Sequence, residues 1–271
     1  MIEPVVGLDR VAALPGRVVL ADVRYYLDGR SGRAAYEGGH LPGAIFVDLD
    51  RDLAAHAGPA GGRHPLPDAT AFAARMAELG VSDDDIVIAY DDAGGVMAAR
   101  LVWLLRATGH DAALLDGGLD AYPEKLVTGT PERAPGDFTA RPWPGDRLAT
   151  IDEAASADGS FVVLDARQPE RFRGETEPID RRAGHIPGAR SLPCRENVDA
   201  AGRFLAPEVL RERFAAVGVT GDAEVISYCG SGVTACHNLL ALELAGFAPG
   251  RLYPGSWSQY SATDRPAATG D

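Results

Sequence analysis

Two stretches of the chain decide its fold, because the second repeats the first. Residues 78–105 read ELGVSDDDIVIAYDDAGGVMAARLVWLL, and residues 216–244 read AVGVTGDAEVISYCGSGVTACHNLLALEL. In each stretch a glycine precedes an apolar run of strand length, which is followed by a polar turn and an apolar segment with helical spacing. Each stretch therefore predicts a buried parallel strand that leads through a turn into a helix.

The repeat extends upstream of these two stretches. VVLAD at 18–22 matches VVLD at 162–165, and GGHLPGA at 38–44 matches AGHIPGA at 183–189. The motifs keep their order, and the two histidines of the second pair are 145 positions apart. A period of this size predicts a duplicated domain, because the repeats of solenoid proteins are much shorter.

Alternating strands and helices predict an α/β fold of two tandem domains, each a parallel sheet flanked by helices. We expect the domains to cover residues 1–135 and 145–271. The segment 128–147, TGTPERAPGDFTARPWPGDR, is rich in proline, glycine and charge and has no periodicity. It is the predicted linker.

Composition limits the class of protein and its partners. The chain has 271 residues, 46% of them hydrophobic, as in ordinary globular proteins, and its net charge is -13. Such a charge argues against binding nucleic acid through phosphate neutralisation. No apolar run of about 20 residues predicts a membrane span, and MIEPVVGLDR does not resemble a signal peptide. We therefore expect neither nucleic acid nor membrane as a partner.

The three cysteines are Cys194, Cys229 and Cys236, and no CxxC pair is present. This argues against a structural zinc site and against a disulfide framework, and it fits a reducing compartment. The expected location is cytoplasmic.

Cys229 lies where chemistry is expected. It follows the predicted strand 224–228 and precedes a glycine-rich turn and a helix that begins near Ala235. Ligands of open α/β sheets bind at this edge, and converging N–H groups at a helix start favour anions such as a thiolate. We predict a nucleophilic thiol whose persulfide the same donors would stabilise, whereas the alternative is a buried, inert cysteine. Cys236 is predicted to pack in the helix, and Cys194 is predicted to be structural or a redox-sensitive accessory thiol.

CGSGVT at 229–234 after an apolar strand, HIPGA upstream and the duplicated domain together resemble the rhodanese superfamily. The resemblance covers nearly the whole chain, and the layout looks like thiosulfate and 3-mercaptopyruvate sulfurtransferases. It implies that Cys229 is the nucleophile at the start of a six-residue loop in which Gly230, Gly232, Val233 and Thr234 bind the substrate. CGSGVT resembles the mercaptopyruvate type, since the thiosulfate type usually has two basic residues after the first position.

The resemblance also implies a proton relay. Ser231 matches the serine of the loop, His64 in GRHPLP matches the histidine, and Asp50 in FVDLD matches the acid. A neutral histidine can pass a proton between the donor thiol and the leaving enolate. The alternative for His64 is a structural loop histidine. His40 and His185 occupy the same place in the matching turns of the two copies and are therefore predicted to be structural.

One arginine is expected to hold the anionic end of the donor. Arg171, in PERFRG, resembles the family arginine that binds the carboxylate or sulfonate, a task that suits the planar guanidinium fork. A solvated surface charge is the alternative. Mercaptopyruvate enzymes use a second arginine before the HIPGA turn; Arg181 or Arg182 is expected there, although EPIDRRAGH is shorter than the family form.

The expected activity is a sulfurtransferase that loads Cys229 from a small anionic donor, 3-mercaptopyruvate or thiosulfate. The expected acceptor is cyanide or a thiol, either a small one or that of a thioredoxin-like protein, and the reaction needs no metal or organic cofactor. The alternatives are thiosulfate:cyanide transfer as the main activity and a non-catalytic sulfur-relay or binding module. A cysteine phosphatase would need an arginine six positions after the cysteine, where Ala235 stands. The first copy has Asp91 at the cysteine position and is predicted to be silent, because a carboxylate cannot carry sulfur.

Overall fold

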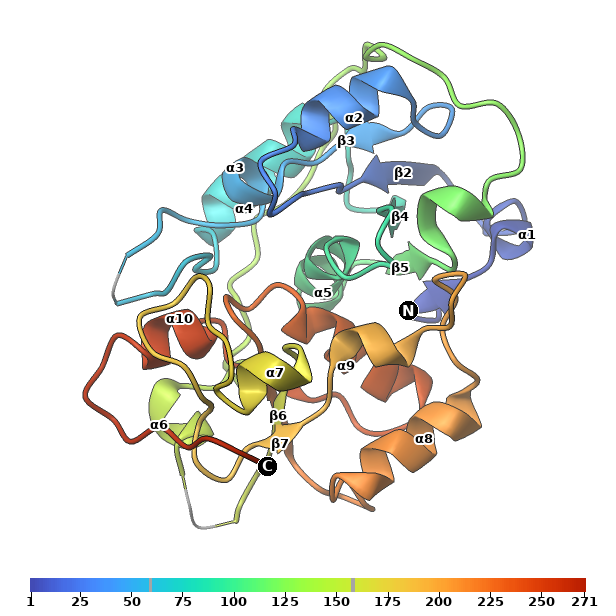
Figure 1. The fold of residues 1–271 in the computed structure, drawn as a ribbon. Helices are drawn as coiled ribbons and strands as arrows, with labels where there is room; N and C mark the ends of the chain where they lie inside the picture. Colours follow the sequence, from blue (N-terminus) through green and yellow to red (C-terminus); the bar gives the residue numbers. More distant parts are fainter. Residues whose placement is uncertain (59, 157–158) are drawn as a thin grey trace. The chain divides into compact units, whose positions relative to one another are not determined.

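The computed structural model describes residues 1–58, 60–156 and 159–271. These residues form two compact units, whose helices and strands are labelled in Figure 1. Unit 1 consists of Met1–Ala55, Pro67–Trp143 and Val198–Phe204, and unit 2 consists of His56–Leu66, Pro144–Asn197 and Leu205–Asp271. The predicted α/β class, with two parallel sheets flanked by helices, is confirmed.

Unit 1 is built on a parallel sheet with the strand order β1-β5-β4-β2-β3. The strands are β1 (Val5–Val6), β2 (Val18–Asp22), β3 (Ile45–Phe46), β4 (Ile86–Tyr90) and β5 (Ala112–Leu115). The helices are α1 (Leu8–Val11), α2 (Gly32–Gly38), α3 (Leu49–Asp52), α4 (Ala69–Glu78), α5 (Ala98–Ala107) and the 3-10 turn η1 (Gly118–Ala121). Every residue of the central strand β4 is buried, as expected for a parallel strand covered on both faces.

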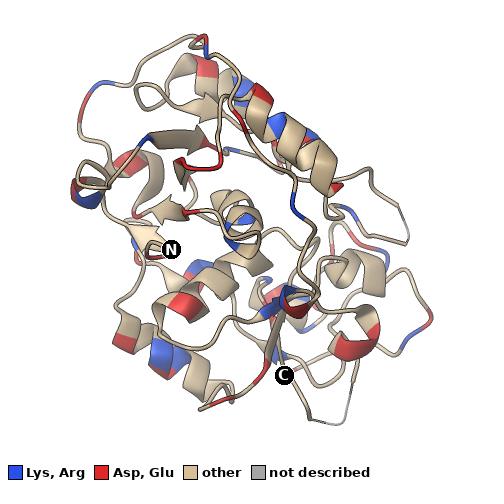
Figure 2. Ribbon diagram, turned by 180° about the vertical axis from the view of Figure 1, so that it is seen from behind, with Lys and Arg blue, Asp and Glu red and all other residues tan. Residues whose placement is uncertain are grey.

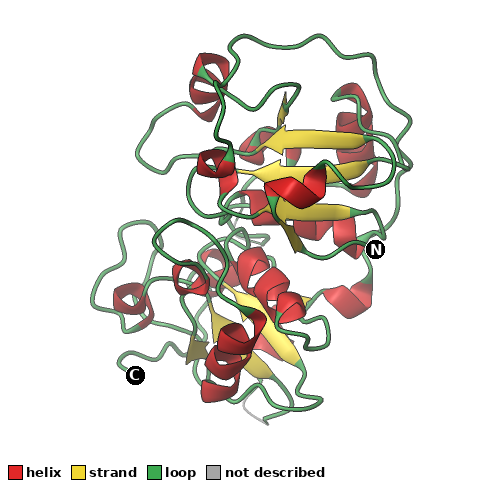
Figure 3. Cartoon of the chain, turned by 90° about the vertical axis from the view of Figure 1, so that its right-hand side faces the viewer, coloured by secondary structure: helices red, strands yellow, loops and turns green. Residues whose placement is uncertain are grey.

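Unit 2 repeats this plan with the strand order β7-β6-β8-β9. The strands are β6 (Val162–Asp165), β7 (Arg190–Ser191), β8 (Val225–Tyr228) and β9 (Arg251–Leu252). The helices are α6 (Ile151–Ala154), α7 (Pro169–Phe172), α8 (Pro207–Ala216), α9 (Ala235–Leu244) and α10 (Ser256–Tyr260), with 3-10 turns η2 (Gly145–Arg147) and η3 (Cys194–Asn197). Figure 3 shows the strands of each unit side by side, with helices beside them. Trp257 and Tyr260 are buried in the core of this unit.

The register of the central strands places two equivalent loops at the carboxyl edge of the sheets. β2 pairs with β4 so that Asp22 lies beside Tyr90, and β6 pairs with β8 so that Asp165 lies beside Tyr228. In each unit the chain leaves the sheet directly after that tyrosine. The loops that begin at residues 91 and 229 therefore occupy matching positions, at the edge where such sheets bind ligands.

The two strand-end acids are tied to the turn that contains HxPGA. Arg24 Nη2 lies 2.7 Å from Asp22 Oδ2 and also donates to the carbonyl oxygen of Gly39. Arg167 makes the same two contacts, with Asp165 at 2.6 Å and with the carbonyl oxygen of Gly184. Because both units keep this arrangement, it supports the sheet edge and is not specific to one loop.

The histidines of the HxPGA turns make equivalent contacts. His40 Nδ1 lies 2.8 Å from the Tyr36 carbonyl oxygen, and His185 Nδ1 lies 2.8 Å from the Phe172 carbonyl oxygen. Each imidazole is also stacked on an aromatic ring, of Tyr36 and of Phe172 respectively. These contacts agree with the structural role predicted for both histidines.

The segment predicted as a linker is extended and packs on unit 1 as far as Trp143. Phe138 stacks on His110 with ring centroids 4.3 Å apart, and Trp143 Nε1 donates to the Pro67 carbonyl oxygen at 2.7 Å.

Figure 2 shows Lys and Arg positions interspersed with Asp and Glu positions along the ribbon. No helix among the described residues is long and apolar enough to cross a membrane.

Two segments belong to a different unit from their neighbours in sequence. His56–Leu66 follows part of unit 1 but groups with unit 2, and Val198–Phe204 interrupts unit 2 but groups with unit 1. In unit 2, the backbone N–H of Arg63 donates to Ser258 Oγ at 3.0 Å, and Gln259 Nε2 donates to the Ala60 carbonyl oxygen at 2.5 Å. The predicted boundaries 1–135 and 145–271 do not include this exchange, which follows from contacts between residues far apart in sequence.

Candidate active site

The loop Cys229–Thr234 joins β8 to α9, and Cys229 is only 2% exposed. The Cys229 backbone N–H donates to Ser256 Oγ at 3.1 Å, and its carbonyl oxygen accepts from the Trp257 N–H at 2.9 Å. The next carbonyl oxygen, of Gly230, accepts from the Ser258 N–H at 2.8 Å. The first turn of α10 therefore fixes the backbone that carries the thiol.

The loop presents backbone donors around Cys229. Among the described residues, no acceptor takes the backbone N–H groups of Ser231, Val233 or Thr234. Gly232 has a φ of +77°, and a Cβ there would lie 2.5 Å from the Pro254 carbonyl oxygen, so the turn requires glycine. Donors without a protein acceptor beside a thiol form a concavity suited to a thiolate or a persulfide anion.

The structure brings two members of the expected relay together. His64 Nδ1 lies 2.7 Å from Ser231 Oγ, and both side chains are buried. Both residues belong to unit 2, because His64 lies in the exchanged segment His56–Leu66. The pair forms a short path for a proton between the loop and the imidazole.

The third expected member of the relay, Asp50, lies in unit 1 on the short helix α3, where it is exposed. Its backbone N–H donates to the Asp48 side chain, which caps this helix. The part of Asp50 in the relay stays a prediction.

Arg171 lies at the loop and is held by acidic side chains. Its Nη2 lies 2.6 Å from Glu177 Oε1 and 3.3 Å from Asp180 Oδ2. Burial would raise the pKa of Glu177, but hydrogen bonds from Arg171 and from the backbone N–H groups of Asp180 and Ile179 outweigh it and lower that pKa. Glu177 therefore stays ionised and holds the guanidinium in place.

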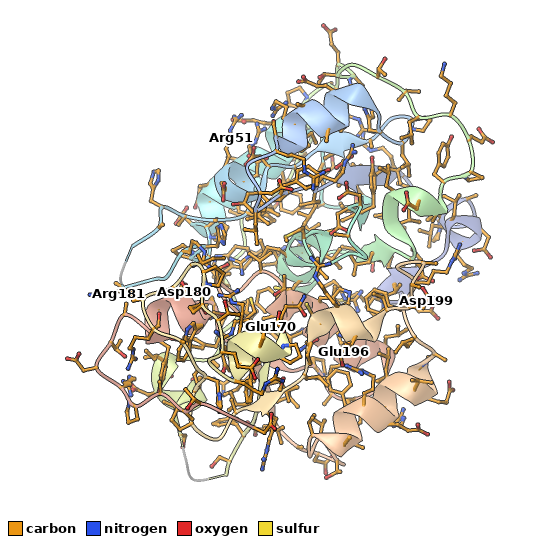
Figure 4. All side chains as sticks on the ribbon, viewed as in Figure 1. Arg51, Glu170, Asp180, Arg181, Glu196 and Asp199 are labelled. Carbon is orange, nitrogen blue, oxygen red and sulfur yellow. The ribbon has the colours of Figure 1, made fainter. Side chains whose placement is uncertain are left out.

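The other two arginines considered for the donor differ in their surroundings. Arg182 donates to the carbonyl oxygens of Ser261, Arg265 and Tyr260, which ties it to the C-terminal segment. Arg181 follows Asp180 and is exposed (Figure 4). The role of Arg181 in binding the donor stays a prediction.

Sequence reasoning did not identify Arg63. A Cβ placed on Gly230 would lie 3.1 Å from Arg63 Nη2 and 3.5 Å from Arg171 Nη1, so both guanidinium groups face the residue after the cysteine. The only signal in the sequence was its position directly before His64. The sequence also contains no indication of the role of Ser256, whose hydroxyl oxygen accepts a hydrogen bond from the Cys229 N–H and whose φ is +51°.

The other two cysteines, Cys194 and Cys236, are buried, and neither forms a disulfide. Burial raises the pKa of Cys194 to about 12, and the nearby Cys229 adds to the shift. Cys194 is therefore a neutral thiol at physiological pH, which makes it a poor nucleophile. Cys236 belongs to the first turn of α9, and its Sγ lies 3.4 Å from the carbonyl oxygen of Gly232 in the preceding loop.

The matching loop of unit 1 is occupied by its own carboxylate. Asp91 Oδ1 accepts from the N–H groups of Ala93 and Gly95, both at 2.8 Å, and Oδ2 accepts from those of Met97 and Ala98, at 2.8 and 3.0 Å. The side chain is fully buried. The loop geometry thus binds an anion in unit 1, where that anion is part of the chain.

The described residues contain no group of three or more His, Cys, Asp or Glu side chains placed to hold a metal ion. The chemistry that this arrangement can perform is nucleophilic attack by the thiol, with a proton path through Ser231 and His64 and a cationic side chain for an anionic substrate.

Comparison with known proteins finds relatives that match this chain over nearly its whole length. The model of the rhodanese-like domain matches residues 9–125 and again 150–263. A protein of Pseudomonas aeruginosa named probable 3-mercaptopyruvate sulfurtransferase is 46% identical over 269 residues, which cover 94% of this chain and 93% of the relative. A Mycobacterium tuberculosis relative, named for thiosulfate sulfurtransferase activity, is 40% identical over 93% of this chain and 91% of its own length.

A solved structure gives the same result. The crystal structure of SseA from Escherichia coli, described as a 3-mercaptopyruvate enzyme, superposes with a TM-score of 0.83 at 33% identity. The match covers 95% of this chain and all of the other.

Proposed function

Because this chain belongs to the rhodanese-like domain family, we propose that it is a sulfurtransferase that takes sulfur from 3-mercaptopyruvate and carries it as a persulfide on Cys229. The observation that carries the proposal is the loop of unit 2. There a buried thiol takes the place of Asp91, and the backbone N–H groups of Ser231 and Val233, which match those bound by the Asp91 carboxylate, have no acceptor among the described residues.

In the first half-reaction the Cys229 thiolate attacks the sulfur of the donor. The S–S bond forms as the C–S bond breaks, and the electron pair of that bond moves onto carbon to give the enolate of pyruvate. The two sulfurs are oxidised and the carbon is reduced. The proton of the donor thiol moves through Ser231 and His64 to that carbon, so that pyruvate leaves and a persulfide anion stays in the loop.

In the second half-reaction an acceptor attacks the outer sulfur. A thiol leaves as a persulfide, or cyanide leaves as thiocyanate, and the Cys229 thiolate is restored. The acceptor expected in the cell is a small thiol or a thioredoxin-like protein, and a cytoplasmic location is proposed because the low, odd cysteine count fits a reducing compartment. Asp50 is proposed to orient His64, and Arg171 to bind the carboxylate of the donor.

Thiosulfate is the second candidate donor, because a relative at 40% identity is named for it. The loop favours mercaptopyruvate, since Gly230 and Ser231 stand where basic residues would serve the dianionic thiosulfate. A non-catalytic relay module is the remaining alternative, and it would not explain a thiol surrounded by donors and a buried Ser231–His64 pair.

The test is steady-state turnover of 3-mercaptopyruvate and of thiosulfate with cyanide as acceptor, with Cys229→Ser as control. We expect a much higher kcat/KM for 3-mercaptopyruvate and no thiocyanate from the serine variant. A preference for thiosulfate would refute the donor assignment. Activity that survives Cys229→Ser would refute the mechanism, and a wild-type protein that releases no thiocyanate would be a binding module.

A further inference from the structure

We propose that Arg63 is the second arm of a two-arginine clamp that, together with Arg171, holds the carboxylate of the sulfur donor. The inference rests on the proposed function and adds a specificity-determining residue to its site. Nothing in the sequence motif around Arg171 indicates it, because Arg63 lies more than a hundred residues away in the chain.

The first observation is the placement of the two guanidinium groups. A Cβ built on Gly230 would be 3.1 Å from Arg63 Nη2, 3.5 Å from Arg171 Nη1 and 3.7 Å from Arg171 Nη2. Both groups therefore converge on the residue that follows the nucleophile. Among the described residues, no acceptor takes a hydrogen bond from Arg63 Nη2 or from Arg171 Nη1. Two donors on different guanidinium groups can bind the two oxygens of one carboxylate.

The second observation is that the backbone fixes Arg63 relative to the loop. Ser258 Oγ accepts from the Arg63 backbone N–H at 3.0 Å, while the Ser258 N–H donates to the Gly230 carbonyl oxygen at 2.8 Å. Gly62, directly before Arg63, has a φ of +82°, and a Cβ there would lie 2.6 Å from the Gly255 carbonyl oxygen. One residue of α10 thus sets the distance between Arg63 and Gly230, so the donor geometry is pre-organised.

The third observation is that Asp180 holds the two arginines together. Its Oδ1 lies 2.5 Å from Arg63 Nη1 and its Oδ2 lies 3.3 Å from Arg171 Nη2. Like charges so close would repel each other, and the shared carboxylate compensates for this. The side chain of Asp180 is 5% exposed, that of Arg171 16% and that of Arg63 28%, so the bridging carboxylate is buried while Arg63 keeps partial access to solvent.

The charges of this cluster are balanced before the donor arrives. Arg167 and Arg171 share Glu177, Arg167 also pairs with Asp165, and Asp180 bridges Arg63 and Arg171, which gives three cations and three anions. Because the cluster has no net positive charge, selection of a carboxylate depends on the direction of the N–H donors of Arg63 and Arg171. Removal of the Arg63 charge would leave Asp180 in excess beside the incoming anion, and repulsion would add to the lost hydrogen bonds.

The experiment pairs a change in the protein with a change in the donor. The donors are 3-mercaptopyruvate and 1-mercaptopropan-2-one, the same thiol ketone with a methyl group in place of the carboxylate. Their kcat/KM values are compared in wild type, Arg63→Gln, Arg63→Lys and Arg181→Gln. Arg173→Gln is the charge control, because the Arg173 guanidinium pairs with the exposed Glu175.

We expect Arg63→Gln to raise the KM for 3-mercaptopyruvate by about 10-fold or more with little change in kcat, since a ground-state contact is lost. Its kcat/KM for the methyl ketone should stay within about twofold of wild type. The KM of Arg63→Lys for 3-mercaptopyruvate should lie between those of wild type and Arg63→Gln, because lysine keeps the charge but not the planar fork. Arg173→Gln should match wild type on both donors.

The outcomes that overturn the clamp are distinct. An unchanged preference for 3-mercaptopyruvate in Arg63→Gln removes Arg63 from the site, and the same loss in Arg181→Gln instead assigns the role to that residue. An equal loss on both donors means that Arg63 only supports the fold. If wild type does not use 3-mercaptopyruvate at all, the proposed function fails, and calorimetric binding of pyruvate to Cys229→Ser, with and without Arg63→Gln, then decides the clamp by itself.

Discussion

The loop after β4 and the loop after β8 have the same backbone plan and opposite contents. In both loops the carbonyl oxygen of the first residue accepts a backbone hydrogen bond with an N···O distance of 2.9 Å. The donor to Asp91 is the N–H of Leu119, and the donor to Cys229 is the N–H of Trp257. The first loop is filled by the Asp91 carboxylate, whereas the second holds a thiol and leaves donors for which the described part of the chain provides no acceptor. The difference shows that the anion-binding loop is a property of the fold. Catalysis becomes possible when the chain does not fill this loop with its own carboxylate, so that the thiolate and the persulfide formed in the reaction can occupy it.

The strongest test of this comparison converts the second loop into the first. Cys229→Asp should abolish sulfur transfer, a loss of at least about 10³-fold, because no sulfur can be carried. It should also raise the Tm relative to Cys229→Ser, because the carboxylate accepts charge-assisted hydrogen bonds from the loop. Thiocyanate release and thermal unfolding measure the two effects. An aspartate variant less stable than the serine variant would show that the loops differ more than their backbones indicate.

The converse change should destabilise unit 1. Asp91→Ala leaves four N–H groups without their acceptor, three of them in buried contacts, and we expect a loss of about 2–5 kcal/mol in the free energy of unfolding. Denaturant titration measures it. Asp92→Ala is the matched control, since Asp92 is an exposed neighbour that accepts only from Tyr26 among the described residues. Equal stability of the two variants would contradict the role given to the Asp91 carboxylate.

A third change removes the proton path and leaves the anion site intact. Ala93 in the first loop matches Ser231 in the second, so Ser231→Ala makes the loops alike at this position. We expect kcat with 3-mercaptopyruvate to fall about 10²-fold, within the range of general acid–base catalysis, with the Tm nearly unchanged. A persulfide should still form slowly and be detectable by mass spectrometry. A variant with normal kcat would exclude the Ser231–His64 pair from the reaction.

The smallest expected effect concerns the residue that supports the nucleophile. Ser256 has a φ of +51°, and Gly118 has a φ of +57° at the equivalent place in unit 1. Ser256→Gly removes the hydroxyl contact with the Cys229 N–H but relieves the backbone strain, so stability should change by less than about 1 kcal/mol while kcat falls a few-fold. Ser256→Ala keeps the strain and should be the less stable of the two. The reverse order in denaturant titration would show that the serine is not strained.

The internal repeat was sufficient to predict most of the fold. The paired motifs gave the strands that end at Asp22 and Asp165 and the loops that begin at Asp91 and Cys229, because each strand and its turn are determined by local residues. The periodicity of the helices likewise follows from neighbouring residues. Elements that are determined by neighbouring residues, and that recur in the same order in both copies, can therefore be predicted from one sequence.

The site was predictable only where a motif marks it. CGSGVT identifies Cys229 and Ser231, and His64 was found through the resemblance. Arg63 could not be found, because its place at Gly230 depends on a hydrogen bond between its backbone and Ser258, 195 positions away. The grouping of His56–Leu66 with unit 2 has the same origin, since contacts over such separations leave no periodicity in the sequence.

That exchanged segment bears on how the gene can evolve. His56–Leu66 is encoded within the first copy but contributes His64 and Arg63 to the unit that holds Cys229. A truncated gene that kept only the second copy would encode the nucleophile without its histidine partner. The first copy has an aspartate and no cysteine at the matching position, yet its deletion would remove His64 and Arg63 from the unit that holds Cys229.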